Sequence, residues 1–103
     1  MNVEVRDNPA ESRYEILDDE RRLGLAQYRL RDDKISFIHT EIDPALQGRG
    51  LAARLVEWAL QDAQARRLDV LPFCPYVRGY IDEHRAFLVL VPEDRRGAFG
   101  LPD

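Results

Sequence analysis

The sequence is poor in several residue types, and each shortage argues against a class of protein. A single cysteine excludes an internal disulfide framework and suits a reducing compartment, which predicts a cytoplasmic location. Two histidines and that cysteine are too few for a structural zinc site, which takes four ligands, so we expect no metal. No stretch approaches the roughly 20 apolar residues that span a bilayer. Residues 1–15 also lack the basic and apolar regions of a secretory signal.

An excess of basic residues is missing too. Fifteen lysines and arginines stand against 19 aspartates and glutamates, so the formal net charge is -4. Nucleic-acid-binding domains usually present a basic face, and we therefore expect no nucleic-acid partner. The composition does supply a 45% hydrophobic share over 103 residues, which is enough for one modest core. We expect a single domain spanning residues 1–103.

The first part of the chain has the pattern of β-strands. Residues 3–7, 13–17, 23–30 and 35–42 either alternate apolar and polar side chains or are rich in β-branched and aromatic residues. Short polar connections separate them, which predicts an antiparallel meander. Side chains alternate along a strand, so the last of these segments should place His39 on the same face as Ile35 and Phe37.

The period then changes to that of a helix. From residue 51 to 67 the apolar positions recur at helical spacing, and a short buried strand follows at 68–73. A strand–helix–strand crossover favours a parallel position for 68–73 beside 35–42. Residues 75–84 predict a second helix, while 86–91 fit either a strand or a buried helical turn. The expected class is α+β: a meander, a central helix, a parallel strand and a second helix.

A glycine-containing turn, Gln47-Gly48-Arg49-Gly50, leads into the central helix. The first turn of a helix has N–H groups without intrahelical partners, and the helix dipole makes this end positive. Such a terminus binds phosphate, and glycines let an anion approach the backbone. A tight loop without a ligand is the other interpretation. The P-loop and dinucleotide-binding motifs do not match, because no Lys-Ser or Lys-Thr follows and a third glycine is absent.

The residues from Gln47 to Ala52 match the Q/R-x-x-G-x-G/A signature of the GCN5-related N-acetyltransferases, and the sequence resembles a small, minimal branch of that superfamily. That branch has a His-Thr-Glu before the loop, here residues 39–41, and a Cys-Pro-Tyr-Val after the next strand, here residues 74–77. The match covers residues 35–84. The resemblance implies the superfamily's α/β-type fold, in which the strands on either side of the central helix splay apart.

The resemblance also implies a co-substrate and a reaction. The protein would bind acetyl-CoA and transfer the acetyl group to an amine of a small molecule or a peptide, as a monomer or a weak homo-oligomer. The backbone of two strand residues would pair with the pantetheine arm, and the loop would hold the pyrophosphate. These coenzyme A-binding residues are Glu41, Ile42, Gln47, Gly48, Arg49, Gly50, Leu51 and Ala52.

Three residues are candidates for catalysis: His39, Cys74 and Tyr80. His39 has a side chain suited to a general base, although a partly buried histidine without a role gives the same pattern. Cys74 is either a nucleophile that takes the acetyl group first or an inert residue lining the site. Tyr80 fits a proton donor to the leaving thiolate, or a core tyrosine. Glu41 is an alternative base.

One expected part is missing from the sequence. Many full-length acetyltransferases place paired helices between their first two strands, and residues 8–12 leave no room for them. Those helices help to form the acceptor pocket. A non-catalytic module that binds acyl-CoA or a protein partner is therefore the alternative function.

Overall fold

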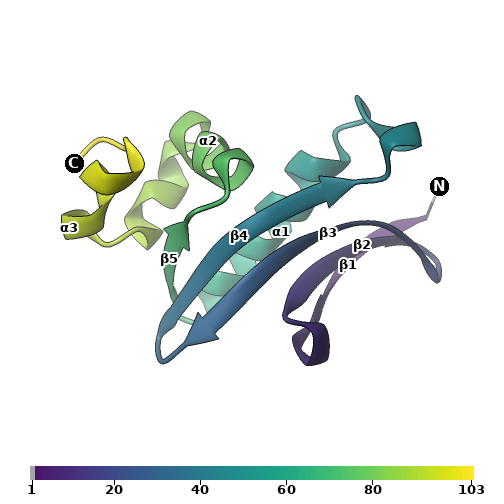
Figure 1. The fold of residues 1–103 in the computed structure, drawn as a ribbon, viewed down its shortest axis with the longest axis horizontal. Coiled ribbons are helices and arrows are strands. Elements are labelled where there is room, and N and C mark those ends of the chain that lie inside the picture. Colours follow the sequence, from purple (N-terminus) through teal and green to yellow (C-terminus); the bar gives the residue numbers. More distant parts are fainter. Residues whose placement is uncertain (1) are drawn as a thin grey trace.

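The computed structural model describes residues 2–103 as a five-stranded sheet with helices packed against it (Figure 1). The strands lie in the order β1 (Val3–Asn8), β2 (Arg13–Asp18), β3 (Arg21–Arg31), β4 (Lys34–Ile42) and β5 (Asp69–Pro72). The first four are antiparallel to their neighbours, and β5 is parallel to β4. The predicted meander and the predicted parallel strand are both confirmed.

The two longer helices follow β4 and β5. They are α1 (Leu51–Ala65) and α2 (Pro75–Glu83), and the four-residue α3 (Glu93–Arg96) comes near the end. Short 3-10 helices lie at Pro9–Glu11, Pro44–Leu46, Arg85–Leu90 and Gly97–Phe99. Of the segment 86–91, residues 86–90 are therefore helical and only Val91 is extended, and Leu90 and Val91 are buried in the main core.

Helix α1 covers one face of the sheet, here called the inner face. Its buried residues meet Tyr14, Ile16 and Phe37 in the core cluster, and Figure 1 shows the helix running behind β3 and β4. The Tyr14 hydroxyl donates a hydrogen bond of 2.7 Å to Asp62 on the helix. At the edge of the sheet, Arg54 of α1 donates to the carbonyl oxygen of Val3.

The opposite face, here called the outer face, is identified by the strand pairing. Tyr14 belongs to the inner face, so its neighbours Arg13 and Glu15 point outward, and their partners Gln27 and Leu25 share that face. Leu25 and Leu17 are buried yet lie outside the core cluster, as their outward position requires.

The expectation for His39 was wrong, and a bulge in β4 is the reason. Gln27 pairs with His39, but its neighbour Tyr28 pairs with Phe37, so Ile38 is an extra residue in β4. Tyr28 and Phe37 both contact Tyr14 on the inner face. His39 therefore lies with Gln27 on the outer face.

Strands β4 and β5 part soon after they begin. Their pairing runs only from Lys34 and Asp69 to Phe37 and Pro72. The chain then turns, and the N–H group of Cys74 donates to the Phe37 carbonyl before Pro75 begins α2. The second half of β4 consequently has a strand neighbour on one side only.

Candidate functional site

The turn before α1 holds its glycines in a conformation that other residues rarely adopt. Gly48 has a φ of +83° and Gly50 a φ of +75°, and Gly50 is the N-cap of α1. A Cβ at either glycine would meet nothing within 4 Å, so the space above the backbone is open. No side chain of residues 2–103 caps this end of the helix. The first N–H groups of α1 thus have no capping side chain, and the anion site at this turn stays a prediction.

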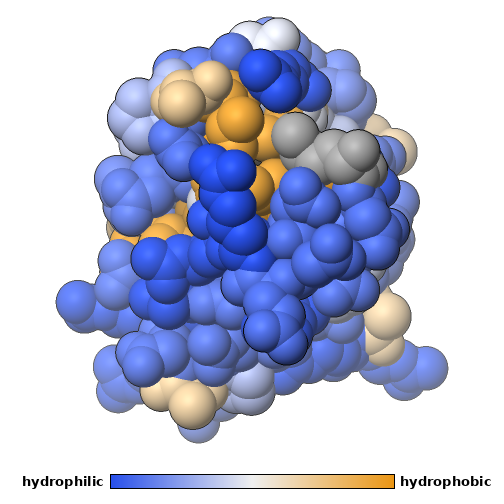
Figure 2. Space-filling model, turned by 90° about the vertical axis from the view of Figure 1, so that its right-hand side faces the viewer, coloured by the Kyte–Doolittle hydropathy of each residue, from blue (hydrophilic) through white to orange (hydrophobic). Residues whose placement is uncertain are grey.

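A cavity of about 600 Å³ extends from this turn along the end of β4. Its polar and glycine residues come from the turn and from β4, and its apolar part includes Leu46 and Ala53. The predicted residues that line it are Glu41, Ile42, Gln47, Gly48, Gly50, Leu51 and Ala52, and Thr40, Pro44 and Tyr76 complete the wall. Arg49 is exposed beside the cavity and does not line it. Figure 2 shows the end of the molecule that carries this turn, where hydrophobic residues are visible in a hollow within a mostly hydrophilic surface.

The ladder between β3 and β4 decides which backbone groups face the cavity. The N–H group of Asp43 donates to Leu23, and in an antiparallel ladder every second residue repeats that bonding. Glu41 therefore directs its peptide groups toward β3. Thr40 and Ile42 direct theirs to the open side of β4, where β5 has already turned away. The sequence predicted that the backbone of Glu41 and Ile42 would pair with the pantetheine arm. Of these two residues, only Ile42 has peptide groups that point away from β3.

Cys74 lies where the two strands part. It is 4% exposed, and its Sγ is 3.3 Å from the hydroxyl oxygen of Thr40. Thr40 pairs with Ala26 of the core, which puts its side chain on the inner face. Sequence reasoning missed Thr40, because only the bulge at Ile38 brings position 40 to the same face as Phe37.

His39 lies away from Cys74. Its side chain is 57% exposed on the outer face, and its Nε2 is 3.6 Å from a carboxylate oxygen of Glu41. These two residues are two positions apart on β4 and therefore lie side by side on that face. The structure thus brings His39 together with Glu41 and separates both side chains from the thiol.

The two tyrosines of α2 have different surroundings. Tyr80 is 8% exposed, does not line the cavity, and stacks on His84 with ring centroids 3.9 Å apart. Tyr76, one turn earlier, lines the cavity. Burial raises the pKa of the Tyr76 phenol, and the charge of Glu83 raises it further. Of the two tyrosines of α2, it is therefore Tyr76, and not the predicted Tyr80, that reaches the cavity wall.

Among residues 2–103, no three His, Cys, Asp or Glu side chains gather in a way that could hold a metal ion. Within the same residues, no helix has the length and apolar character needed to cross a membrane.

Comparison with known proteins identifies the family. The solution NMR structure of a GCN5-like proposed N-acetyltransferase from Staphylococcus aureus is similar to this one, with a TM-score of 0.68 over 88% of this chain and 89% of that chain. The two sequences are 22% identical, so this likeness shows a shared fold alone. No curated protein matches the chain. A family model described as GCN5-related N-acetyl-transferase matches residues 13–90, and the protein belongs to that family.

Proposed function

We propose that this protein binds acetyl-CoA in the cavity at the start of α1 and transfers the acetyl group to an amine. The observation that carries the proposal is the continuity of the cavity. It runs from the uncapped helix start at Gly50, past the open backbone of β4, to Thr40 and Tyr76. A cavity of this shape suits an elongated ligand with an anionic group at one end and a reactive group at the other.

The anionic end of coenzyme A would lie on the turn. The N–H groups from Gln47 to Ala52 would bind its pyrophosphate, and Arg49 would add a positive charge beside it. The amide groups of the pantetheine arm would pair with the free peptide groups of Thr40 and Ile42, as a short strand in the place that β5 leaves. This arrangement would bring the thioester to the point where β4 and β5 part.

The reaction requires an amine without its extra proton and a donor for the leaving thiolate. In direct transfer the amine nitrogen attacks the thioester carbonyl carbon, the C–S bond breaks, and coenzyme A leaves as a thiolate. His39, at the parting of the strands on the outer face, would take the amine proton, with Glu41 beside it. Tyr76 would give a proton to the thiolate from the cavity wall. Tyr80 would act only if α2 moved.

A two-step route through Cys74 is the second possibility for the same reaction. The Cys74 sulfur would attack the thioester carbonyl carbon, and coenzyme A would leave as a thiol that takes up the proton lost by Cys74. The amine would then attack the acetyl-cysteine, lose its proton to His39, and release the Cys74 thiol. Its hydrogen-bonding neighbour is Thr40 and not His39, so His39 would serve only the second step. Mass spectrometry of the protein after acetyl-CoA treatment tests this route, with Cys74→Ala as the control. Absence of an acetyl adduct on wild-type Cys74 would count against it.

A thermal-shift titration with acetyl-CoA and with coenzyme A tests binding. A ligand at 100 times its dissociation constant stabilises a protein by about 2.7 kcal/mol, which in a domain of this size raises Tm by about 10–20 °C. Gly50→Glu should abolish the shift, because a carboxylate would occupy the anion site. Gly100→Glu is the matched control, since Gly100 also has a positive φ, +69°, and open space around it. No shift in the wild type would remove the proposal.

A non-catalytic acyl-CoA-binding module is the alternative function. The connection between β1 and β2 favours this alternative. It contains only the 3-10 helix Pro9–Glu11, so it supplies no longer helices that could form one side of an acceptor pocket. Turnover separates the two functions. Release of coenzyme A with any amine from a panel of small amines and peptides would establish an enzyme. Binding without release across the panel would favour the module.

A further inference from the structure

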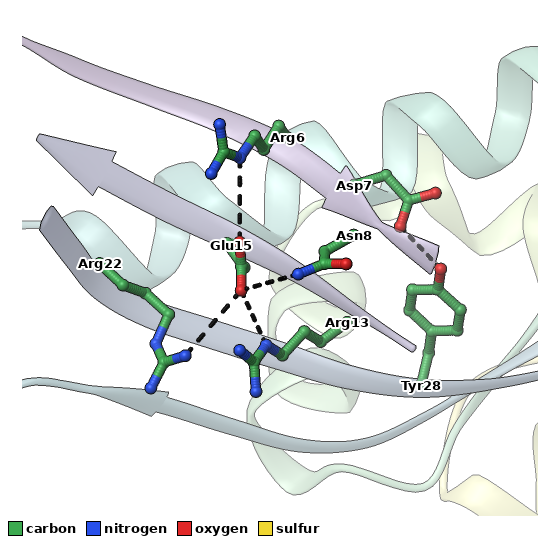
Figure 3. A network of polar contacts seen from close by, with 7 residues as sticks. All are labelled: Arg6, Asp7, Asn8, Arg13, Glu15, Arg22 and Tyr28. Carbon is green, nitrogen blue, oxygen red and sulfur yellow. Dashed lines mark hydrogen bonds and ion pairs between the residues drawn. The ribbon is translucent and has the colours of Figure 1, made fainter. Parts of the chain in front are cut away.

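The outer face of β1 to β3 carries a group of arginines held around one buried carboxylate. Glu15 of β2 is 4% exposed, although no helix covers this face in the part of the chain that the structure describes. Arg13 donates to it at 2.8 Å, and Asn8 donates at 3.3 Å. Arg6 and Arg22 approach the same carboxylate from the neighbouring strands. Figure 3 shows these side chains arranged around Glu15. We call Arg6, Arg13 and Arg22 the arginine group.

The arginine group has bonding capacity that Glu15 does not use. The nearest guanidinium nitrogens of Arg6 and Arg22 are 3.8 and 3.9 Å from the carboxylate, which is too long for a hydrogen bond. Their side chains are 59% and 47% exposed. Arg13 is bonded to Glu15 through its Nε. Planar guanidinium groups bind carboxylates with two parallel hydrogen bonds, so three such groups can take further carboxylates from solution.

The pairing of the strands connects the arginine group to the proposed reaction site. One cross-strand row runs Arg6, Glu15, Leu25, Glu41, and the next runs Asn8, Arg13, Gln27, His39. Over β1 to β3, the outer face therefore carries Arg6, Arg13 and Arg22 against the carboxylates of Glu4 and Glu15, and on β4 it bears a carboxylate and the histidine. Glu15 and Glu41 are two strand spacings apart, which is about 10 Å. An extended peptide covers this distance with about three residues.

We propose that the outer face binds an acidic peptide segment through Arg6, Arg13 and Arg22. Resting on the acetyl transfer proposed above, we further infer that this segment belongs to the acceptor. Its carboxylates would lie on the arginine group, while its amine would lie beside Glu41 and His39, where the strands part. The acceptor would then be a peptide with acidic residues roughly three positions from the reactive amine.

The charges favour a peptide over a nucleic acid on this face. The whole chain carries a net charge of -4 and would repel a long polyanion. Glu4 also lies on the outer face, opposite Leu17, next to the arginine group. Nucleic acids need a long row of cations for their phosphates. A segment with two or three carboxylates needs only the arginine group, and the carboxylate of Glu41 suits its ammonium group.

The first experiment measures binding without acetyl-CoA, so it does not depend on the reaction. A fluorescein-labelled peptide carries one lysine and, three residues later, two glutamates; a second peptide has glutamines in their place. Fluorescence anisotropy should show tighter binding of the glutamate peptide. Exposed ion pairs are individually weak, so Arg6→Gln combined with Arg22→Gln should reduce this affinity roughly tenfold, and raised salt should do the same. Arg67→Gln, an exposed arginine beyond α1, is the matched control.

The outcomes separate the two parts of the proposal. Equal binding of both peptides, or no loss in the double arginine variant, would overturn the docking surface. Tighter binding of a single-stranded RNA of the same length than of the glutamate peptide would overturn the choice of occupant. If the glutamate peptide binds as expected, its acetylation is compared with that of the glutamine peptide. A KM several times lower, with the difference lost in the double variant, supports the acceptor assignment, and equal KM values would refute it.

Discussion

Glu15 offers a direct test of how a buried carboxylate is held on an open sheet face. Burial disfavours its charge and would raise its pKa, but the hydrogen bonds from Arg13 and Asn8 and the nearby arginines outweigh burial and lower the pKa below its usual range. Glu15→Gln keeps the shape and removes the charge. It should weaken the charged hydrogen bond to Arg13, which is worth about 1.5–3 kcal/mol.

The expected loss is therefore about 2 kcal/mol of unfolding free energy at pH 7, or a Tm lower by about 10 °C in a domain of this size. The folded-state pKa of Glu15 is depressed, so its contribution is present above the unfolded-state pKa and disappears as the pH falls through the folded-state value. Urea denaturation of wild type and Glu15→Gln from pH 7 down to pH 3 should show two curves that converge in acid. Glu41→Gln, whose carboxylate is 60% exposed, should match the wild type throughout.

Two results would refute this reasoning. Equal stability of wild type and Glu15→Gln at pH 7 would mean that the attraction of the arginines only cancels the cost of burying the carboxylate charge. The charge would then add nothing to the free energy of unfolding. A difference that stays the same at pH 3 would mean that the substitution acts through packing and not through the carboxylate charge.

Three further predictions concern the sheet and the cavity. A Cβ at Gly24 would lie 2.6 Å from the carbonyl oxygen of Glu41, so Gly24→Ala should lower Tm and weaken coenzyme A binding together, measured by thermal shift. Tyr14→Phe removes the hydroxyl that donates to Asp62 and should cost about 1 kcal/mol in urea denaturation; an unchanged midpoint would contradict the role of this bond. If acetyl transfer is established, Tyr76→Phe should lower kcat about 10- to 100-fold with unchanged binding, whereas Tyr80→Phe should retain most of it.

Much of the fold follows from local pattern in the sequence. Alternating apolar residues in 3–42 predict the strands, and apolar residues at helical spacing from Leu51 onward predict α1. Each element buries one face, so its apolar residues recur with the period of that element. The glycine turn before α1 could also be predicted, since Gly48 and Gly50 meet a conformational demand that is local to the turn.

The positions of the candidate catalytic side chains were harder to predict, because they depend on register. The extra residue Ile38 reverses the faces of all later side chains in β4, and nothing in the residues around it marks the bulge. It sends His39 outward and Thr40 to Cys74. Tyr76 and Tyr80 are four residues apart and lie on nearly one side of α2, so only the placement of the helix decides which of them reaches the cavity.

Because of the bulge in β4, substitutions at neighbouring positions of this strand affect different faces of the sheet. After Ile38, even-numbered side chains belong to the inner face and odd-numbered side chains to the outer face. Substitutions at His39 and Glu41 can therefore alter what approaches from outside, while the backbone that faces the cavity keeps its course. On this strand, side chains of the outer face can change without a change in those of the inner face.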